Sequence, residues 1–307
     1  MINRRRKRLT GAPLPAPVSV DADETTVEIV YTDDDDITLS AVDDAEFDSR
    51  NWAFITPEEQ AVLRQQTVLL AGTGLASQIA ALACRTGFTR FIVADGDSVE
   101  LSNLNRQAFR HADIGRNKAE ATADLLRAIR QSVEVETLPR FLDAGSIREP
   151  LTRASVAVSS LNWDSPDLFE FNRVARELGV PVLMPINLGW GGAVMVLTAH
   201  SPSLEEFIGF DSERHARQDV VKLVIERIFT VAPGGIPPYL RRVFATFMSE
   251  GEQWRYDPQL GVAAAMTSAL AVRAMVALAL GEPVAIVPNV LYVDARVASD
   301  PGLTSAR

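Results

Sequence analysis

The 307-residue chain is poor in the residues that build covalent and metal-bound frameworks. It contains a single cysteine, Cys84, and only three histidines. One cysteine excludes an intramolecular disulfide framework and a zinc site built from cysteine pairs. A reduced, cytoplasmic protein is therefore expected. Because no histidine has a matched partner in the sequence, all three are predicted to be surface residues.

The chain also has no excess of positive charge and no long uninterrupted apolar run. Its 30 Lys and Arg against 40 Asp and Glu give a net charge of −10, which argues against general nucleic-acid binding. The longest apolar stretch, residues 262–280, is broken by Thr267, Ser268 and Arg273. These breaks favour a buried helix over a membrane span. The basic residues at 4–8 precede no apolar segment, so no targeting segment is expected.

Three regions are expected along the chain. Residues 1–47 combine a basic cluster, prolines and an acidic run, which is typical of a mobile arm, although residues 26–31 alternate as a strand would. Residues 48–199 are predicted to form a nucleotide-binding core. Residues 200–307 are predicted to supply a crossover or insertion segment, then a helix and a strand that complete the same domain.

Short apolar strands alternate with longer helices between residues 67 and 198. This rhythm predicts an α/β, Rossmann-like, doubly wound and largely parallel sheet with helices on both faces. Thr56, Pro57 and Glu59 predict the start of a preceding helix through a capping box. The expected strands are 67–71, 90–94, 133–137, 155–159, 181–185, 193–198 and 289–294, and the expected helices are 76–86, 117–131, 164–178 and 259–281.

A glycine turn follows the first of these strands. Gly72 and Gly74 lie between the strand and a helix N-terminus, an arrangement that cradles phosphates. Asp95 closes the next strand and is placed for ribose hydroxyls. The third glycine of the usual fingerprint is replaced by Ser77, which is small enough for close packing. The turn alone is also typical of a plain strand-to-helix connection.

Two further motifs make the prediction specific. Residues 95–107 read DGDSVELSNLNRQ, and residues 115–119 read GRNKA. They resemble the patterns D-x-D-x-V-x-x-S-N-L-x-R-Q and G-x-x-K-A of the ubiquitin-activating-enzyme-like family, the ThiF/MoeB/HesA adenylyltransferases. The resemblance runs from about residue 50 to 294. It implies an enzyme that transfers AMP from ATP to a carboxylate, usually a peptide or small-protein C-terminus, and releases pyrophosphate.

The resemblance also implies a role for each matching residue. Asp95 would hold the ribose, and Arg106 and Lys118 would neutralise charge as pyrophosphate departs; an arginine fork and a lysine point charge suit phosphate oxygens. The alternative is that both cations are ordinary solvated charges. Arg50 would reach a phosphate, commonly across a homodimer interface. The implied cofactor site comprises Gly72, Gly74, Asp95, Asp97, Asn103, Arg106, Gln107 and Lys118.

The magnesium-binding segment departs from the family pattern. Ser159 and Asn162 stand where the family has two aspartates, and a neutral amide is a poorer Mg²⁺ ligand than a carboxylate. Asp164, two residues on, is the predicted metal ligand. If it cannot reach the metal, the alternative is a catalytically impaired nucleotide-binding scaffold that works beside an active partner. Thioester relay through Cys84 is not expected, because a buried helical cysteine behaves as a small hydrophobic residue.

The acceptor is expected near the fifth strand. Asn187, Gly189 and Trp190 are predicted to line a substrate channel, with a plain strand-to-strand turn as the alternative. The leading hypothesis is thus an adenylyltransferase that uses ATP and Mg²⁺. A nicotinamide-dependent oxidoreductase would leave Asn103, Arg106, Gln107 and Lys118 unexplained.

Overall fold

The computed structural model describes residues 41–232, 234–249 and 258–298. Seven strands form one sheet in the order β3-β2-β1-β4-β5-β6-β7. The first five are mutually parallel, and β6 runs antiparallel to both β5 and β7. This confirms the predicted largely parallel sheet. The strands are β1 (Thr67–Ala71), β2 (Arg90–Ala94), β3 (Glu134–Leu138), β4 (Val156–Ser159), β5 (Val182–Leu188), β6 (Gly191–Leu197) and β7 (Leu291–Asp294).

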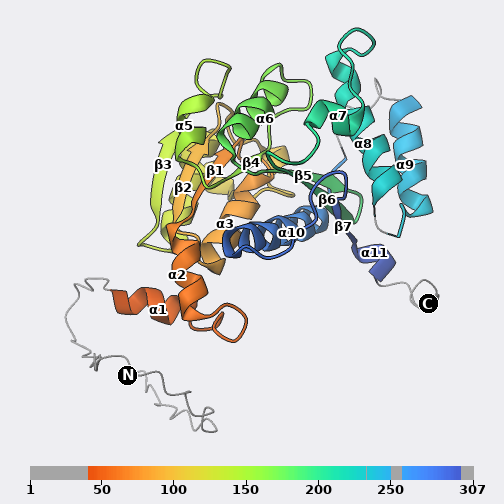
Figure 1. The fold of residues 1–307 in the computed structure, drawn as a ribbon. Helices are drawn as coiled ribbons and strands as arrows, with labels where there is room; N and C mark the ends of the chain where they lie inside the picture. The colour runs from red at the N-terminus through yellow and green to blue at the C-terminus, as the bar shows by residue number, and fades with distance from the viewer. Residues whose placement is uncertain (1–40, 233, 250–257, 299–307) are drawn as a thin grey trace. The chain divides into compact units, whose positions relative to one another are not determined.

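Helices cover both faces of the sheet, as predicted (Figure 1). Alternate side chains of β1 show why: Val68 and Leu70 are buried in one apolar cluster, and Leu69 and Ala71 in another. The first cluster includes residues of α3 (Ala76–Thr86), α4 (Lys118–Ile129) and α10 (Gly261–Leu280). The second includes residues of α5 (Arg148–Arg153), α6 (Asp167–Leu178), α7 (Leu204–Ile208) and α8 (Val220–Val231).

The predicted capping box starts α2 (Pro57–Gln65). The Thr56 hydroxyl accepts from the Glu59 amide at 3.3 Å, and the Glu59 carboxylate accepts from the Thr56 amide at 2.8 Å. Before it, α1 (Ala41–Asp48) begins inside the stretch predicted to be an arm. Residues 1–40, with the predicted strand 26–31, lie outside the described residues.

A buried ion pair holds α1 against the body. Arg130, at the end of α4, donates to both carboxylate oxygens of Asp48 at 3.0 and 2.9 Å, and Arg64 donates to Asp48 at 2.9 Å. The side chains of Arg130 and Asp48 are 2% and 1% exposed. Burial disfavours the guanidinium charge, but the hydrogen bonds that Arg130 donates to Asp48 outweigh that effect and raise the pKa of Arg130.

The remaining described elements follow β6 or connect strands. The segment predicted as a crossover contains α7, α8 and α9 (Pro238–Ser249), and the short α11 (Ala295–Ala298) follows β7. Three single turns of 3-10 helix lie at Leu101–Asn103, His111–Asp113 and Arg217–Asp219.

Helix α10 corresponds to the predicted buried helix. It is the one described helix long and apolar enough to cross a membrane, but 56% of that apolar window is buried inside the protein. Its buried face packs on α3 and on strands β5 and β6. The packing accounts for its hydrophobicity without a membrane.

Candidate nucleotide site

The glycine turn lies where the strand order reverses. β2 lies on one side of β1 and β4 on the other, and ligands of doubly wound sheets bind in the crevice at the carboxyl ends of such strands. Gly72 follows β1 with φ +82°, and a Cβ atom there would lie 2.7 Å from the Ser160 carbonyl oxygen. Only glycine allows the turn after β1 to approach the loop after β4 this closely.

Asp95 fixes the turn from the next strand. One carboxylate oxygen accepts from the Thr73 amide at 2.7 Å and from the Thr73 hydroxyl at 2.9 Å, and the other accepts from the Asp97 amide at 2.8 Å. Asp95 is 5% exposed. Because a carboxylate has about four acceptor positions, these three bonds leave capacity for a ribose hydroxyl.

Lys118 joins the same group of side chains. Asn117 caps α4 by accepting from the Ala119 amide at 2.9 Å, and its own amide donates to the Asp95 carbonyl at 3.0 Å. The next residue, Lys118, then places its ammonium 3.1 Å from the Asp97 carboxylate, with only 11% of its side chain exposed. Lys118 is therefore not an ordinary solvated charge, and the structure brings it together with Asp95 and Asp97.

The loop that carries Arg106 and Gln107 lies over the start of α3. The Ser77 hydroxyl accepts from the Ala108 amide at 3.0 Å and donates to the Gly74 carbonyl at 2.7 Å. The Gln107 amide nitrogen would be 3.3 Å from a Cβ atom at Gly74. Ser77, which replaces the third glycine, thus fastens this loop to the glycine turn. Its close packing agrees with the sequence-based expectation, since Ser77 is fully buried.

The Arg106 guanidinium donates to neutral oxygens. Its Nη1 donates to the Ser102 carbonyl at 3.0 Å and to the Asn105 side chain at 2.8 Å. Its Nε donates to the Gln259 side-chain oxygen at 3.0 Å. Sequence reasoning missed Gln259, because nothing local connects two residues 153 positions apart. Asn103 stabilises the start of the loop that carries Arg106. Its side chain is buried, and its side-chain oxygen accepts a hydrogen bond from the Glu100 amide at 3.0 Å.

Phe141 is a second residue that sequence reasoning missed. Its side chain is 61% exposed, which is unusual for a phenylalanine, and it lies on the backbone of Gly96, directly after Asp95. A Cβ atom at Gly96 would be 2.6 Å from the ring. The local sequence offers no signal for this contact beyond an aromatic residue in the loop after β3.

Arg50 is not brought to this group. Its turn is tied to Thr86, the last residue of α3, which accepts from the Gln60 side chain at 2.9 Å and from the Asn51 side chain at 3.5 Å. The glycine turn lies at the other end of that 11-residue helix, about 16 Å away. Within one chain, Arg50 and the predicted phosphate site lie at opposite ends of α3.

The predicted metal segment lies beside the glycine turn. Asp164 is exposed in the loop between β4 and α6, and this loop begins at Ser160, which contacts Gly72. The Ser159 hydroxyl is buried and has no hydrogen-bond partner among the described residues. Across the described ranges, no cluster of three or more Asp, Glu, His or Cys side chains could hold a metal. Magnesium that arrives on ATP is usually bound by only one or two carboxylates besides the phosphates.

The predicted acceptor segment forms a tight hairpin. Gly189, with φ +62°, and Trp190 connect β5 to β6, so the alternative of a strand-to-strand turn describes the backbone. Trp190 is 43% exposed, and its amide donates to the Tyr239 hydroxyl at 3.1 Å. That hydroxyl donates to Asp294 at 2.5 Å. Burial, together with the Asp294 hydrogen bond, raises the pKa of Tyr239 to about 12.

Asn187 precedes this hairpin in β5. Its side-chain nitrogen donates to the Gln259 side-chain oxygen at 3.1 Å. Its own side-chain oxygen is buried and finds no hydrogen-bond partner in the part of the chain that the structure describes. Asn187 and Arg106 therefore share one acceptor atom. Through Gln259, the structure connects the predicted acceptor segment to the predicted phosphate loop.

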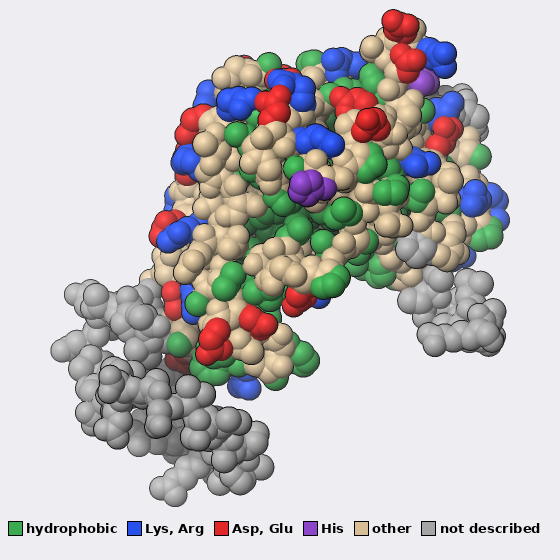
Figure 2. Space-filling model, in the orientation of Figure 1, with side chains coloured by type: hydrophobic (Ala, Val, Ile, Leu, Met, Phe, Trp, Pro, Cys, Tyr) green, Lys and Arg blue, Asp and Glu red, His purple; other side chains and the backbone are tan. Residues whose placement is uncertain are grey.

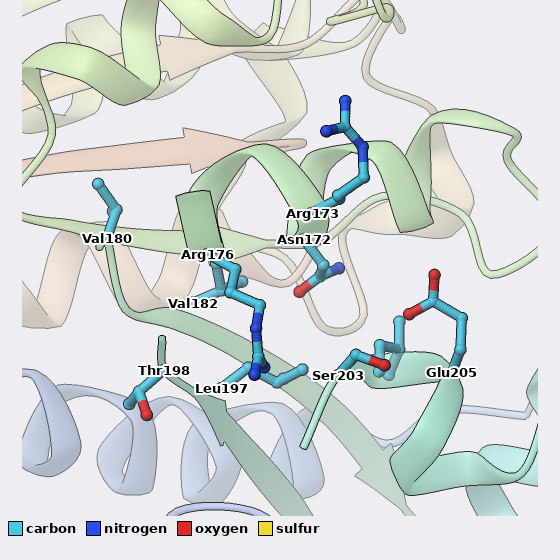
Figure 3. Close-up of a pocket in the computed structure, with 10 residues that line it drawn as sticks. Asn172, Arg173, Arg176, Val180, Val182, Leu197, Thr198, Ser203 and Glu205 are labelled. Carbon is cyan, nitrogen blue, oxygen red and sulfur yellow. The ribbon is translucent and has the colours of Figure 1, made fainter. Parts of the chain in front are cut away.

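A separate cavity of about 120 Å³ lies among α6, α7 and the ends of β5 and β6 (Figure 3). Its lining combines the aliphatic residues Val180, Val182 and Leu197 with Asn172 and Arg176. None of the predicted site residues lines this cavity.

The arrangement around the glycine turn agrees with a comparison against known families, in which the ThiF family matches residues 48–299. The chain belongs to the ThiF family. Among curated relatives, this ThiF-family chain is similar to the sulfur carrier protein ThiS adenylyltransferases of Escherichia coli and Bacillus subtilis. It is 28% identical to the first over 46% of this chain and 56% of the relative. It is 32% identical to the second over 50% and 47%. The chain thus spans about half the length of these relatives.

Solved structures share the fold. The crystal structure of PaaA matches with a TM-score of 0.60 and 20% identity, over 84% of this chain and 82% of PaaA. The structure of E. coli MccB with ATP matches with a TM-score of 0.53 and 16% identity, over 77% and 66%. At these identities the likeness shows the ThiF-family fold alone.

Proposed function

We propose that this protein is an ATP-dependent adenylyltransferase that activates a carboxylate. The observation that carries the proposal is the convergence of Asp95, Asp97 and Lys118 beside the Gly72–Gly74 turn, with the Arg106–Gln107 loop lying on the same turn. The adenylyltransferase names of the curated relatives support the same activity.

Each part of the site has a role in this reaction. The phosphates bind at the glycine turn and the N-terminus of α3, where unpaired amides point at the anion. The acceptor carboxylate attacks the α-phosphate in line; one oxygen–phosphorus bond forms, and the bond to the pyrophosphate oxygen breaks. Lys118 and Arg106 stabilise the negative charge that leaves with pyrophosphate. Positioning and charge stabilisation supply most of the catalysis in such transfers.

The nucleoside binds on the β2 side of the turn. Asp95 accepts hydrogen bonds from the ribose hydroxyls. The exposed ring of Phe141 lies on Gly96, the residue after Asp95, and offers a stacking face for the adenine. Aromatic stacking is sequence-tolerant but energetically substantial, about 1–3 kcal/mol per base. Asp164 would hold the Mg²⁺ that accompanies ATP. When bound, this ion would shield the negative charge of the phosphates.

We propose a homodimer for the intact site. Arg50 lies at the far end of α3 from its own glycine turn, so a phosphate contact from Arg50 would have to be made to a second copy of the chain. Four residues on, Phe54 is 90% exposed beside a cavity of about 380 Å³ lined by Ile55, Leu82, Val272 and Leu280. Figure 2 shows hydrophobic side chains exposed around the middle of one face, with charged side chains toward its upper edge. Covering the exposed Phe54 ring and the apolar lining of the cavity beside it favours association.

The acceptor is a peptide or small carrier protein, and the product stays an acyl-adenylate. A relay through Cys84 is disfavoured, because burial raises the pKa of its thiol to about 11 and the side chain is fully buried. A single buried thiol also suits the reducing cytoplasm.

ATP–pyrophosphate exchange tests the proposal. Purified protein is incubated with ATP, Mg²⁺, labelled pyrophosphate and a panel of peptides with free C-terminal carboxylates. Exchange that requires a peptide and is lost in Arg106→Ala supports the enzyme. ATP binding without exchange for any peptide would favour the scaffold alternative, to which the Ser159 and Asn162 departures point.

A further inference from the structure

Gln259 is fastened to the phosphate loop at several points. Its side-chain oxygen accepts from Arg106 Nε at 3.0 Å, and its carbonyl accepts from the Asn105 side chain at 3.0 Å. Two residues on, a Cβ atom at Gly261 would lie 2.6 Å from the Asn105 carbonyl oxygen. The chain entering α10 thus packs tightly against the loop of residues 105–106, and the amide of Gln259 faces the guanidinium.

The same oxygen of Gln259 also accepts from Asn187 at 3.1 Å. Asn187 belongs to β5, on the acceptor side of the site, whereas Arg106 belongs to the phosphate side. One atom therefore accepts hydrogen bonds from both side chains. An amide oxygen can orient a planar guanidinium without itself adding negative charge, so this contact does not compete for the anion as a carboxylate would.

We propose that Gln259 is a positioning residue that holds Arg106 toward the ATP phosphates and couples that orientation to Asn187. This inference rests on the proposed function. It predicts that a change at Asn187, on the acceptor side, alters ATP affinity, and that it does so only through Gln259.

ATP titration calorimetry on the full chain tests the first part. In Gln259→Met both hydrogen bonds to the side chain are lost, and ATP binding should weaken about tenfold, because hydrogen bonds to charged groups are stronger than neutral ones. Gln259→Glu keeps an acceptor oxygen in the same place but adds a negative charge. Its ATP binding should weaken at least as much, and in 0.5 M salt its difference from the wild type measured at the same salt should shrink, because salt screens the added charge.

The control is Gln66→Met. Gln66 is also partly buried and donates one side-chain hydrogen bond, to the Val62 carbonyl at 3.1 Å, at the end of α2. Its ATP affinity should equal that of the wild type. If Gln259→Glu loses the same factor in ATP affinity at low and at high salt, relative to the wild type at each salt, the added charge does not act on the bound phosphates, and that result would overturn the inference.

Double-mutant cycles test the coupling. In an Arg106→Ala background, Gln259→Met should have no further effect on ATP affinity. Asn187→Ala should weaken ATP binding about threefold where Gln259 is present and should have no effect in Gln259→Met. The reason is that substitutions within one hydrogen-bond network do not have additive effects. Additive effects in either cycle would refute the coupling. If the wild type binds no ATP, the proposed function itself fails; if it binds ATP and Gln259→Met binds equally well, only this inference fails.

Discussion

Gly72→Ala should damage both the stability and the nucleotide affinity of the protein. Gly72 has φ +82°, a region that costs an L-residue about 1–2 kcal/mol. The new methyl group would also lie 2.7 Å from the Ser160 carbonyl oxygen, and overpacking of this kind costs about 1–3 kcal/mol. Alanine restricts the unfolded chain, which returns about 0.4–1 kcal/mol. The net loss in unfolding free energy should be about 1–5 kcal/mol.

Gly179→Ala separates the two contributions. Gly179 ends α6 with φ +74°, and no atom of the described residues outside its immediate chain neighbours lies within 4 Å of the position its Cβ would take. It should therefore show only the backbone cost, about 1 kcal/mol. Urea unfolding followed by circular dichroism measures both variants, and ATP titration at 10 °C measures binding in the folded state. Equal stability losses for the two variants, or wild-type ATP affinity in Gly72→Ala, would refute the close approach of the two loops as the basis of the site.

Three further predictions concern residues around the turn. Phe141→Ala should weaken ATP binding about 5- to 100-fold, and Phe141→Trp should retain it; equal affinities for both variants and the wild type would contradict base stacking. Cys84 should resist iodoacetamide at pH 8 in the native protein and react fully in urea, because burial raises the pKa of its thiol to about 11; rapid native labelling would contradict this assignment. Burial opposes ionisation of Asp113, but hydrogen bonds from Arg110 and Arg116 prevail and lower the pKa of its carboxyl group. The ionised Asp113 carboxylate therefore stabilises the folded protein above its unfolded-state pKa of about 4. This stabilisation is lost as the pH falls toward the lower pKa of the folded state. The difference in unfolding free energy between the wild type and Asp113→Asn should thus be largest at pH 7 and should shrink below about pH 4. A difference that does not change with pH would contradict the lowered pKa of Asp113.

The parallel sheet could be predicted because its signals are local. Strands such as residues 67–71 and 90–94 are short apolar runs bounded by turns, and their predicted bounds match β1 and β2. The hairpin at Gly189 was harder to predict from the sequence. The predicted strands left residues 186–192 as a loop, whereas β5 continues to Leu188 and β6 begins at Gly191, so the predicted loop was too long. Glycines in β6 weaken the strand signal but are required there, since a Cβ atom at Gly191 would lie 1.8 Å from the Val293 carbonyl oxygen.

The site was predicted where motif residues are close in sequence. Asp95, Asp97 and Lys118 meet because the connection from β2 to α4 starts and ends at the same place, where Ser98 and Asn117 form an antiparallel bridge. The contacts of Gln259 with Arg106 and of Phe141 with Gly96 join distant segments, and no local pattern encodes them. The distance of Arg50 from the glycine turn likewise depends on which end of α3 its turn contacts.

ATP titration of the full chain and of Lys118→Ala tests the central claim most directly. Lys118 is almost buried, with its ammonium against Asp97 beside the turn that Asp95 fixes. The account predicts saturable, magnesium-dependent ATP binding by the wild type and a loss of at least tenfold in Lys118→Ala, with an unchanged unfolding transition. Undetectable ATP binding by the wild type, or undiminished binding by the variant, would contradict it.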